Sequence, residues 1–288
     1  MTEHDTRTDV RRRSIRMHGR DLAFREYPGT GTPILLVHGI GSSAETWVDV
    51  PDRLSARGAH VIAVDLPGHG ESSKGPGDYS LGSLASSLRD LLDELGIERV
   101  HLVGHSLGGG VSLQFSYQFP ERVDTIVLES SGGLGEEAFT GLRAASLPGS
   151  ELVIRWAINE RTIKGATWVG SRLDRLGIAT HALSPRALET VAWLAEEDRR
   201  AAFLATLRSV VGPRGQRVSA LEKLHLMEAS RVLIIWGDKD PMIPMKHGEN
   251  AHAMLPGSRL VIFPGAGHEP HGDDPESFAE LVLGHVRD

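Results

Sequence analysis

The ten residues VHLVGHSLGG, positions 100–109, carry more information about the fold than any other stretch of this 288-residue chain. An apolar run of strand length leads into Gly-x-Ser-x-Gly, and a stretch of small residues with helical character follows. This order is typical of a serine presented on a sharp turn between a strand and a helix. The turn brings the residues two before and two after the serine close together, and Gly104 and Gly108 are small enough for that approach. Because such strained turns usually mark function, Ser106 is the candidate nucleophile.

Composition places the chain among ordinary globular proteins. Hydrophobic residues make up 40% and charged residues 24% of the sequence, and the formal net charge is −7. An acidic balance argues against a nucleic-acid or anionic-membrane surface. No stretch approaches the 18 apolar residues of a membrane span, and the absence of cysteine removes disulfides, thiol nucleophiles and thiolate metal sites together. The polar start, Met1–Arg13, has no apolar core of a secretion signal, so we expect a cytoplasmic protein.

Apolar runs recur along the chain at strand length. Many are continuous rather than alternating, which indicates a parallel sheet buried on both faces. Between them lie helical patterns, such as the leucine-rich stretch 81–95 with Ser80 as N-cap and Gly96 as C-cap. This alternation predicts an α/β fold. The predicted strands are 14–17, 22–27, 33–37, 60–64, 100–103, 124–128, 232–236 and 260–263.

One segment breaks this rhythm. Residues 134–224 contain no convincing strand and instead show amphipathic helical patterns, such as the apolar positions within 203–211. The segment falls between two predicted strands that each end in a candidate catalytic residue. We therefore expect a helical cap at residues 134–224, inserted into a core domain formed by residues 1–133 and 225–288, although additional core helices are the alternative.

A serine hydroxyl needs an adjacent base to act as a nucleophile. His268 lies in a glycine-rich loop after the last predicted strand, and an imidazole can take the Ser106 proton and later return it to a leaving group. Asp240 follows the strand 232–236 and is the preferred acid to orient that ring. Asp238 and Glu129 remain alternatives for the acid.

Two further histidines lie close to these positions in the sequence. His271 is an alternative base, three residues after His268, although a supporting role is expected for it. His105 should point away from Ser106, because neighbouring side chains at a strand end alternate, and is expected to be structural. The backbone N–H groups of Ile40 and Leu107 are the predicted donors to the oxyanion, one after the strand 33–37 and one at the start of the helix after Ser106.

Taken together, these motifs resemble those of cap-bearing members of the α/β-hydrolase superfamily, including its Ser–Asp–His chain order. The resemblance implies an eight-stranded, mostly parallel sheet flanked by helices, an active site under the cap, and the acid at Asp240 rather than Asp238. It runs from about residue 14 to 285. The matching stretches are His38-Gly39, Asp65-Leu66-Pro67-Gly68-His69-Gly70-Glu71-Ser72, residues 104–109, Gly237-x-x-Asp240-x-x-x-Pro244 and Gly267-His268-x-Pro270.

The family resemblance narrows the reaction without naming the substrate. Ser106 stands where similar epoxide hydrolases and haloalkane dehalogenases carry an aspartate, so hydrolysis of small to medium apolar carboxylic esters through an acyl-enzyme is the expected activity. Carbon–carbon hydrolysis of ring-cleavage products is the runner-up. Similar enzymes of that class usually have Asn near the nucleophile and Trp after the catalytic histidine, where this chain has His105 and Glu269. A hydrolase-like small-molecule receptor is the third possibility.

Substrate contacts are expected from the cap and from the oxyanion loop. Trp156, Trp168 and Trp193 lie in the predicted cap, and Trp47 follows the oxyanion loop, so each is a candidate for an apolar acyl site. The sequence carries no metal-binding histidine cluster, no phosphate loop and no dinucleotide fingerprint, and neither a metal nor a cofactor is expected.

Overall fold

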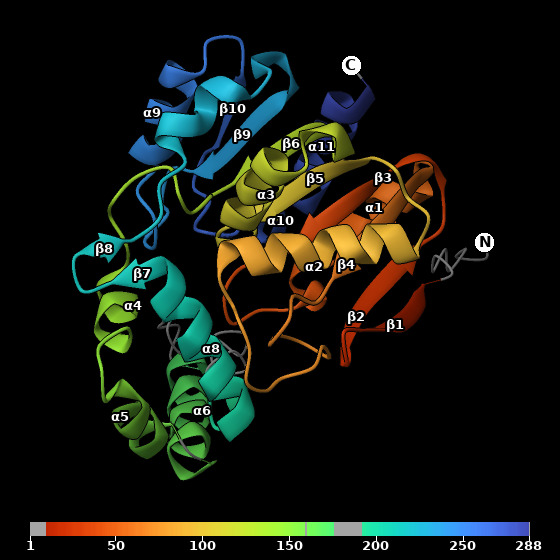
Figure 1. Ribbon diagram of the computed structural model, residues 1–288. Coiled ribbons are helices and arrows are strands. Elements are labelled where there is room, and N and C mark those ends of the chain that lie inside the picture. Colours follow the sequence, from red (N-terminus) through yellow and green to blue (C-terminus); the bar gives the residue numbers. More distant parts are fainter. Residues whose placement is uncertain (1–9, 159, 176–191, 288) are drawn as a thin grey trace, which may run out of the picture.

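Eight strands form one mixed sheet in the computed structural model, which describes residues 10–158, 160–175 and 192–287 (Figure 1). Their order across the sheet is β1-β2-β4-β3-β5-β6-β9-β10. Only the β1–β2 and β2–β4 pairs are antiparallel, so the predicted eight-stranded, mostly parallel sheet is confirmed. The strands are β1 (Arg11–Met17), β2 (Arg20–Tyr27), β3 (Thr30–Val37), β4 (Ala59–Val64), β5 (Val100–His105), β6 (Val123–Glu129), β9 (Val232–Gly237) and β10 (Arg259–Phe263).

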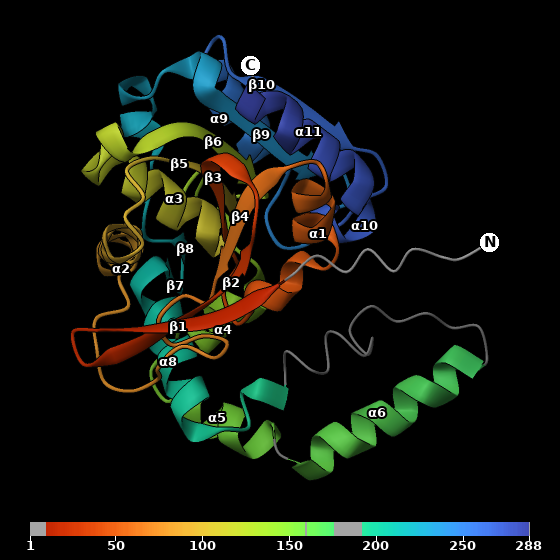
Figure 2. The ribbon, with the colours of Figure 1, turned by 90° about the vertical axis from the view of Figure 1, so that its right-hand side faces the viewer.

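Helices cover both faces of the sheet, as the continuous apolar strands predict (Figures 1 and 2). On one face α1 (Val50–Ala56), the short α10 (Pro270–Asp273) and α11 (Pro275–Arg287) enclose an apolar cluster that includes Leu54 and Phe278. The opposite face carries α2 (Leu81–Glu94), α3 (Leu107–Gln118) and α9 (Lys246–Met254), which pack on a second cluster. All six residues of β5 are buried, so the central strand holds the following turn rigidly.

The helix ends follow from local sequence. The Ser80 hydroxyl accepts the Ser83 N–H at the start of α2, and Gly96 adopts a φ of +67° just after its end. At α11 the Asp274 carboxylate accepts the Ser277 N–H, with Pro275 at the first helical position. These caps set where each helix begins relative to the strand before it.

The helical insertion lies between β6 and β9, as predicted. It contains α4 (Thr140–Ala145), α5 (Ser150–Ala157), α6 (Glu160–Arg175) and α8 (Glu197–Val210), with α6 extending from the body of the molecule in Figure 2. A hairpin of two-residue strands, β7 (Val211–Gly212) and β8 (Gly215–Gln216), follows α8 and was not expected, because strands that short leave no periodic pattern.

Short 3₁₀ helices are also present in the described part of the chain. They are η1 (Ala44–Trp47), η2 (Pro120–Arg122), η4 (Leu221–Leu226) and η5 (Ala229–Arg231). The two ends of the predicted cap, Leu134 and Leu224, are both buried in the cluster shared with α2 and α3. The insertion is therefore anchored in the core at both of its ends. Among the helices described, none has the length and apolar character needed to cross a membrane.

Candidate active site

Ser106 occupies the strained turn that its sequence predicts. It joins β5 to α3 with φ 53° and ψ −114°, a left-handed φ that a non-glycine residue rarely adopts. A Cβ on Gly104 would lie 2.4 Å from the Gly108 carbonyl oxygen, and a Cβ on Gly108 would lie 2.0 Å from that of Val37. Both positions therefore require glycine for packing reasons alone. The strain is held by the surrounding backbone and points to function.

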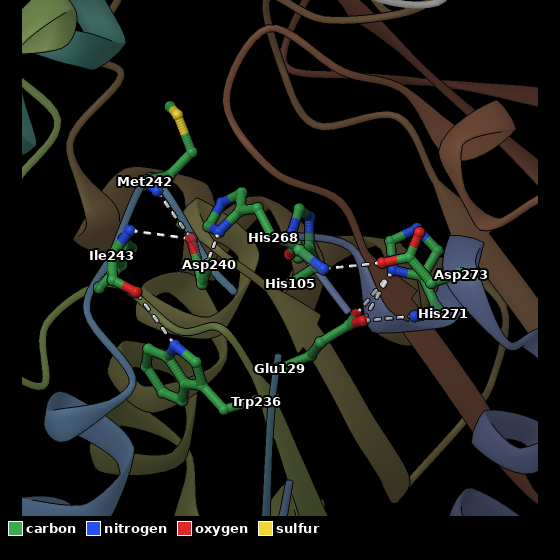
Figure 3. Close-up of polar contacts among 10 residues, drawn as sticks. His105, Glu129, Trp236, Asp240, Met242, Ile243, His268, His271 and Asp273 are labelled. Carbon is green, nitrogen blue, oxygen red and sulfur yellow. Dashed lines mark hydrogen bonds and ion pairs between the residues drawn. The ribbon is translucent and has the colours of Figure 1, made fainter. Parts of the chain in front are cut away.

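His268 and Asp240 lie in direct contact at the carboxyl ends of β9 and β10 (Figure 3). The His268 Nδ1–H donates to the Asp240 carboxylate over 2.8 Å. The other carboxylate oxygen accepts the backbone N–H groups of Met242 and Ile243 at 2.8 and 3.0 Å. Burial acts to raise the pKa of Asp240, but these donors outweigh it, with His268 first among them, and the pKa lies below its ordinary value. Asp240 is thus a buried carboxylate that fixes the tautomer of His268.

Ser106 and His268 face the same cavity. Among the described residues no hydrogen bond joins the Ser106 hydroxyl to the His268 ring, a contact that commonly tightens only when substrate is bound. In a neutral imidazole whose Nδ1–H donates to Asp240, Nε2 carries no proton. That nitrogen is the atom able to accept a proton inside the cavity.

The predicted oxyanion donors come from the two segments that flank Ser106. Leu107 is the first residue of α3, where backbone N–H groups have no acceptor within the helix and the helix dipole favours negative charge. Ile40 lies in the turn after β3, next to Gly39, whose Cβ would sit 3.2 Å from the Ser106 Cβ. Both Leu107 and Ile40 line the cavity. The arrangement can therefore present two N–H groups to an anionic oxygen.

Buried His38 holds the oxyanion turn in place. Its Nδ1–H donates to the Gly39 carbonyl oxygen at 2.7 Å, and its Nε2 accepts the Leu66 N–H at 3.0 Å. Burial lowers the pKa of His38 to about 4, so the ring is neutral and its tautomer is defined by these two bonds. Leu66 belongs to the loop after β4, where the Asp65 carboxylate accepts the Ala44 and Glu71 N–H groups. The matching motif at residues 65–72 is therefore a scaffold for the site.

The alternative acids and the alternative base lie elsewhere. The Asp238 carboxylate accepts the Gly265 N–H at 2.6 Å and is exposed, so it braces the loop that carries His268. Glu129 and His271 are paired with each other, 2.9 Å apart and fully buried. His105 is buried next to this pair and also lines the cavity, and its Nε2–H donates to the His268 carbonyl oxygen at 2.9 Å.

A cavity of about 840 Å³ is lined by Ser106, His268, Ile40 and Leu107. Its walls come from the strand-end loops on one side and from the insertion on the other, and most of the lining side chains are apolar. The insertion contributes residues that sequence reasoning did not single out as substrate contacts, although the apolar period within 203–211 marked the helix that carries two of them. These are Ala138, Phe139, Leu142, Leu207, Val210, Val211, Gln216 and Val218.

The tryptophans expected to line the acyl site do not line this cavity, and that expectation is corrected. Trp47 has no exposed surface and packs against the His271 ring at 4.7 Å, on the other side of the site. Trp156 and Trp168 are 83% and 60% exposed on the insertion. Trp193 stacks under the Arg199 guanidinium, 4.8 Å from the ring centroid. Trp47 is thus buried in the core, Trp156 and Trp168 are exposed, and none of the four tryptophans is among the residues that line the cavity.

The described part of the chain contains no candidate metal-binding site. No group of three or more His, Asp or Glu side chains there is arranged to hold a metal ion. The cavity presents a serine, an imidazole bound to a carboxylate and backbone donors, together with the charged side chains of Lys239, Glu269 and Asp273.

Comparison with known proteins places these features in a family. A model described as "alpha/beta hydrolase fold" matches residues 32–275. An uncharacterized protein of Mycobacterium tuberculosis is 46% identical over 270 residues, covering 92% of this chain and 78% of that protein. A 2-hydroxy-6-oxononadienedioate/2-hydroxy-6-oxononatrienedioate hydrolase of Escherichia coli is 29% identical over 282 residues, or 94% and 91% of the two chains.

Solved structures share the same architecture. A thermophilic esterase from Thermogutta terrifontis superposes with a TM-score of 0.71 over 96% of this chain and 98% of that chain. Because the sequence identity is only 23%, this structural similarity supports the fold and not a shared function.

Proposed function

The chain belongs to the alpha/beta hydrolase fold family, and we propose that it is a serine hydrolase that cleaves carboxylic esters of small to medium apolar substrates. One observation carries the proposal: His268, oriented by Asp240 at 2.8 Å, shares an apolar cavity with Ser106 on its strained turn. A serine, a base and an orienting acid from three separate loops are the parts needed for acyl transfer. An arrangement of this kind has little structural use in a cavity.

Acylation follows from these positions. The Ser106 oxygen attacks the ester carbonyl carbon while its proton passes to Nε2 of His268, and the carbonyl oxygen becomes an anion. The N–H groups of Ile40 and Leu107 stabilise that anion, each contributing on the order of 3 kcal/mol. As the tetrahedral intermediate collapses, the bond to the alcohol oxygen breaks, and His268 gives the proton to the departing alcohol.

Deacylation repeats the sequence with water. His268 takes a proton from a water molecule, the resulting hydroxide attacks the acyl carbon, and the second tetrahedral intermediate releases the carboxylic acid as the proton returns to Ser106. The buried Asp240 carboxylate stabilises the imidazolium formed in both halves, since it stays charged at neutral pH because its pKa is held low. No cofactor enters this scheme.

The cavity supports an apolar acyl or alcohol group. Its volume, about 840 Å³, lies within the range of small-molecule sites. Leu142, Leu207 and Val210 present an apolar wall from the insertion. The ionisable residues on the lining, which are His105, Lys239, His268, Glu269 and Asp273, all belong to the core domain. Burial of each further methylene against such a wall is worth about 0.8 kcal/mol. We therefore expect the affinity for the ester to rise with the length of its acyl chain until the chain fills the cavity.

A second candidate is hydrolysis of a carbon–carbon bond. The 29% identical relative from Escherichia coli, which matches over 94% of this chain, is named as a hydrolase of 2-hydroxy-6-oxononadienedioate and 2-hydroxy-6-oxononatrienedioate. The same serine and base could serve that reaction, with the carbanion rather than the alcohol as leaving group. Among the described residues that line the cavity, Lys239 is the only lysine or arginine, and its ammonium group could pair with an ionised ring-cleavage product.

The test is hydrolysis of p-nitrophenyl esters from acetate to laurate, with Ser106→Ala as the control. We expect Ser106-dependent turnover with a clear optimum of chain length, and unchanged folding of the variant by circular dichroism. Activity of Ser106→Ala within tenfold of the wild type would overturn the triad. If the wild type cleaves none of these esters but cleaves a vinylogous 1,5-diketone, the carbon–carbon assignment replaces the ester assignment.

A further inference from the structure

Two charged residues form a fully buried pair directly behind the catalytic residues. Glu129 ends β6, His271 lies in α10, and neither side chain has any exposed surface. The Glu129 carboxylate accepts the His271 backbone N–H at 2.8 Å and the ring Nδ1–H at 2.9 Å. A buried charge without such partners would cost several kcal/mol, so this pair is a specific arrangement rather than incidental packing.

The contacts of the His271 ring favour its imidazolium form. Its second nitrogen, Nε2, lies 3.1 Å from the Thr46 carbonyl oxygen, which can only accept a hydrogen bond. Nδ1 faces the Glu129 carboxylate, which accepts a hydrogen bond when it is ionised, so both nitrogens carry protons in the ion pair. Burial alone would lower the pKa of His271, but the Glu129 carboxylate outweighs it and the pKa lies above its ordinary value. Burial likewise would raise the pKa of Glu129, and His271 brings it below its ordinary value.

This pair connects the three segments that build the active site. The backbone carbonyl of Glu129 accepts the Ser106 N–H at 3.0 Å, so the residue that holds His271 also holds the nucleophile turn. His271 lies three residues beyond His268 on the same loop and helix. Through Thr46, in η1, the ring reaches the segment that follows the oxyanion turn.

His105 adds a parallel connection between the same segments. Its ring donates to the His268 carbonyl oxygen and packs 4.8 Å from the His268 ring and 5.2 Å from the His271 ring. Burial lowers the pKa of His105 to about 4, so this ring is neutral and does not oppose the charge of His271 at neutral pH. The nucleophile turn and the base loop are thus joined by one neutral and one ionic contact.

We propose that the Glu129–His271 ion pair is a positioning element for catalysis, which sets the distance between His268 and Ser106 and aligns the oxyanion segment with both. This inference rests on the proposed function, because it assigns a role in the reaction of the same three residues. Neither Glu129 nor His271 touches the cavity, and both act through the loops they join. A shift of about 1 Å between nucleophile and base costs roughly 100-fold in rate, so loss of the pair should appear in kcat.

The test compares Glu129→Gln with a matched control, Glu26→Gln. Glu26 also pairs with a histidine, His60 at 3.1 Å, and is largely buried, but it lies on β2 away from the cavity. Active sites are counted by titration to completion with a p-nitrophenyl phosphonate, and kcat and KM are measured on the best ester and expressed per titrated site. This normalisation removes any loss that is merely a smaller folded fraction.

We expect Glu129→Gln to lower kcat per titrated site about 10- to 100-fold with KM changed less than threefold. Glu26→Gln should keep kcat per titrated site within twofold of the wild type. If Glu129→Gln does not fold, the double variant Glu129→Gln/His271→Gln removes both buried charges together, is expected to fold, and should show the same loss. A kcat per titrated site within twofold of the wild type in either folded variant overturns the proposal.

Ser106→Ala, measured in the same series, keeps the two hypotheses apart. If Ser106→Ala retains turnover, the proposed function itself fails. If Ser106→Ala is inactive while Glu129→Gln has wild-type kcat per titrated site, the triad stands and only the positioning role is lost.

Discussion

Replacing Asp240 with asparagine should disable the site without disturbing the fold. One carboxylate oxygen of Asp240 accepts two backbone N–H groups, from Met242 and Ile243, and the other accepts the His268 Nδ1–H. Asparagine has one carbonyl oxygen, which would take the two backbone donors, and its NH₂ group would then face His268. Because NH₂ only donates, Nδ1 must give up its proton and Nε2 must carry it.

A proton on Nε2 removes the base. Ser106 then has no acceptor for its proton, and the negative charge that stabilises the imidazolium is also lost. We expect kcat/KM to fall about 10³- to 10⁴-fold, the range for a triad whose histidine is held in the wrong tautomer. That loss corresponds to ~4–5.5 kcal/mol of transition-state stabilisation. The backbone donors keep their acceptor, so the free energy of unfolding should change by less than about 2 kcal/mol.

The assay is p-nitrophenyl ester hydrolysis at pH 7.5, with thermal unfolding followed by circular dichroism. Asp238→Asn is the matched control, since this exposed neighbour braces Gly265 and should keep activity within threefold. Glu129→Gln should also lose less than Asp240→Asn. Activity of Asp240→Asn within tenfold of the wild type would refute the reasoning, and a larger loss in Asp238→Asn or Glu129→Gln would reassign the acid.

Three other predictions concern packing, protonation and metals. Gly108→Ala should lower the free energy of unfolding in urea by about 3 kcal/mol or more, because its Cβ would lie 2.0 Å from the Val37 carbonyl oxygen. Gly284→Ala is the control, since Gly284 lies in open space on α11, and this variant should be neutral or stabilising. Equal effects of the two substitutions would contradict the prediction. The free energy of unfolding should fall between pH 6.5 and pH 5 by on the order of 2 kcal/mol for each buried neutral histidine. In this pH range the unfolded chain binds protons at these histidines and the folded state does not. An unchanged midpoint of urea unfolding between the two pH values would contradict this prediction. Burial lowers the pKa of these groups to about 4, about 3 and about 4 in His38, His69 and His105. EDTA should leave the ester hydrolysis rate unchanged, and a rate restored by added divalent metal would point to a metal site instead.

Local sequence patterns predicted much of the fold. Apolar runs of strand length separated by capped helices predicted all eight strands of the sheet to within three residues at each end, because burial on both faces demands continuous apolar sequence. The turn at Ser106 was equally predictable from the sequence, since Gly104 and Gly108 lie so close to neighbouring backbone that neither position can hold a side chain. The tiny hairpin after α8 was not, because two-residue strands carry no period.

The sequence by itself determined the nucleophile turn, the order of the candidate triad and the helical insertion, because each depends on neighbouring residues or on a strand end. Tertiary structure decided what meets across the chain. Glu129 and His271, each a rival for a catalytic role in the sequence, are 142 residues apart and pair with one another. Trp47 packs behind the site, while Leu142 and Leu207 form its wall. Periodicity says that a side chain is buried, but only the folded chain decides whether it is buried against the core or against the cavity.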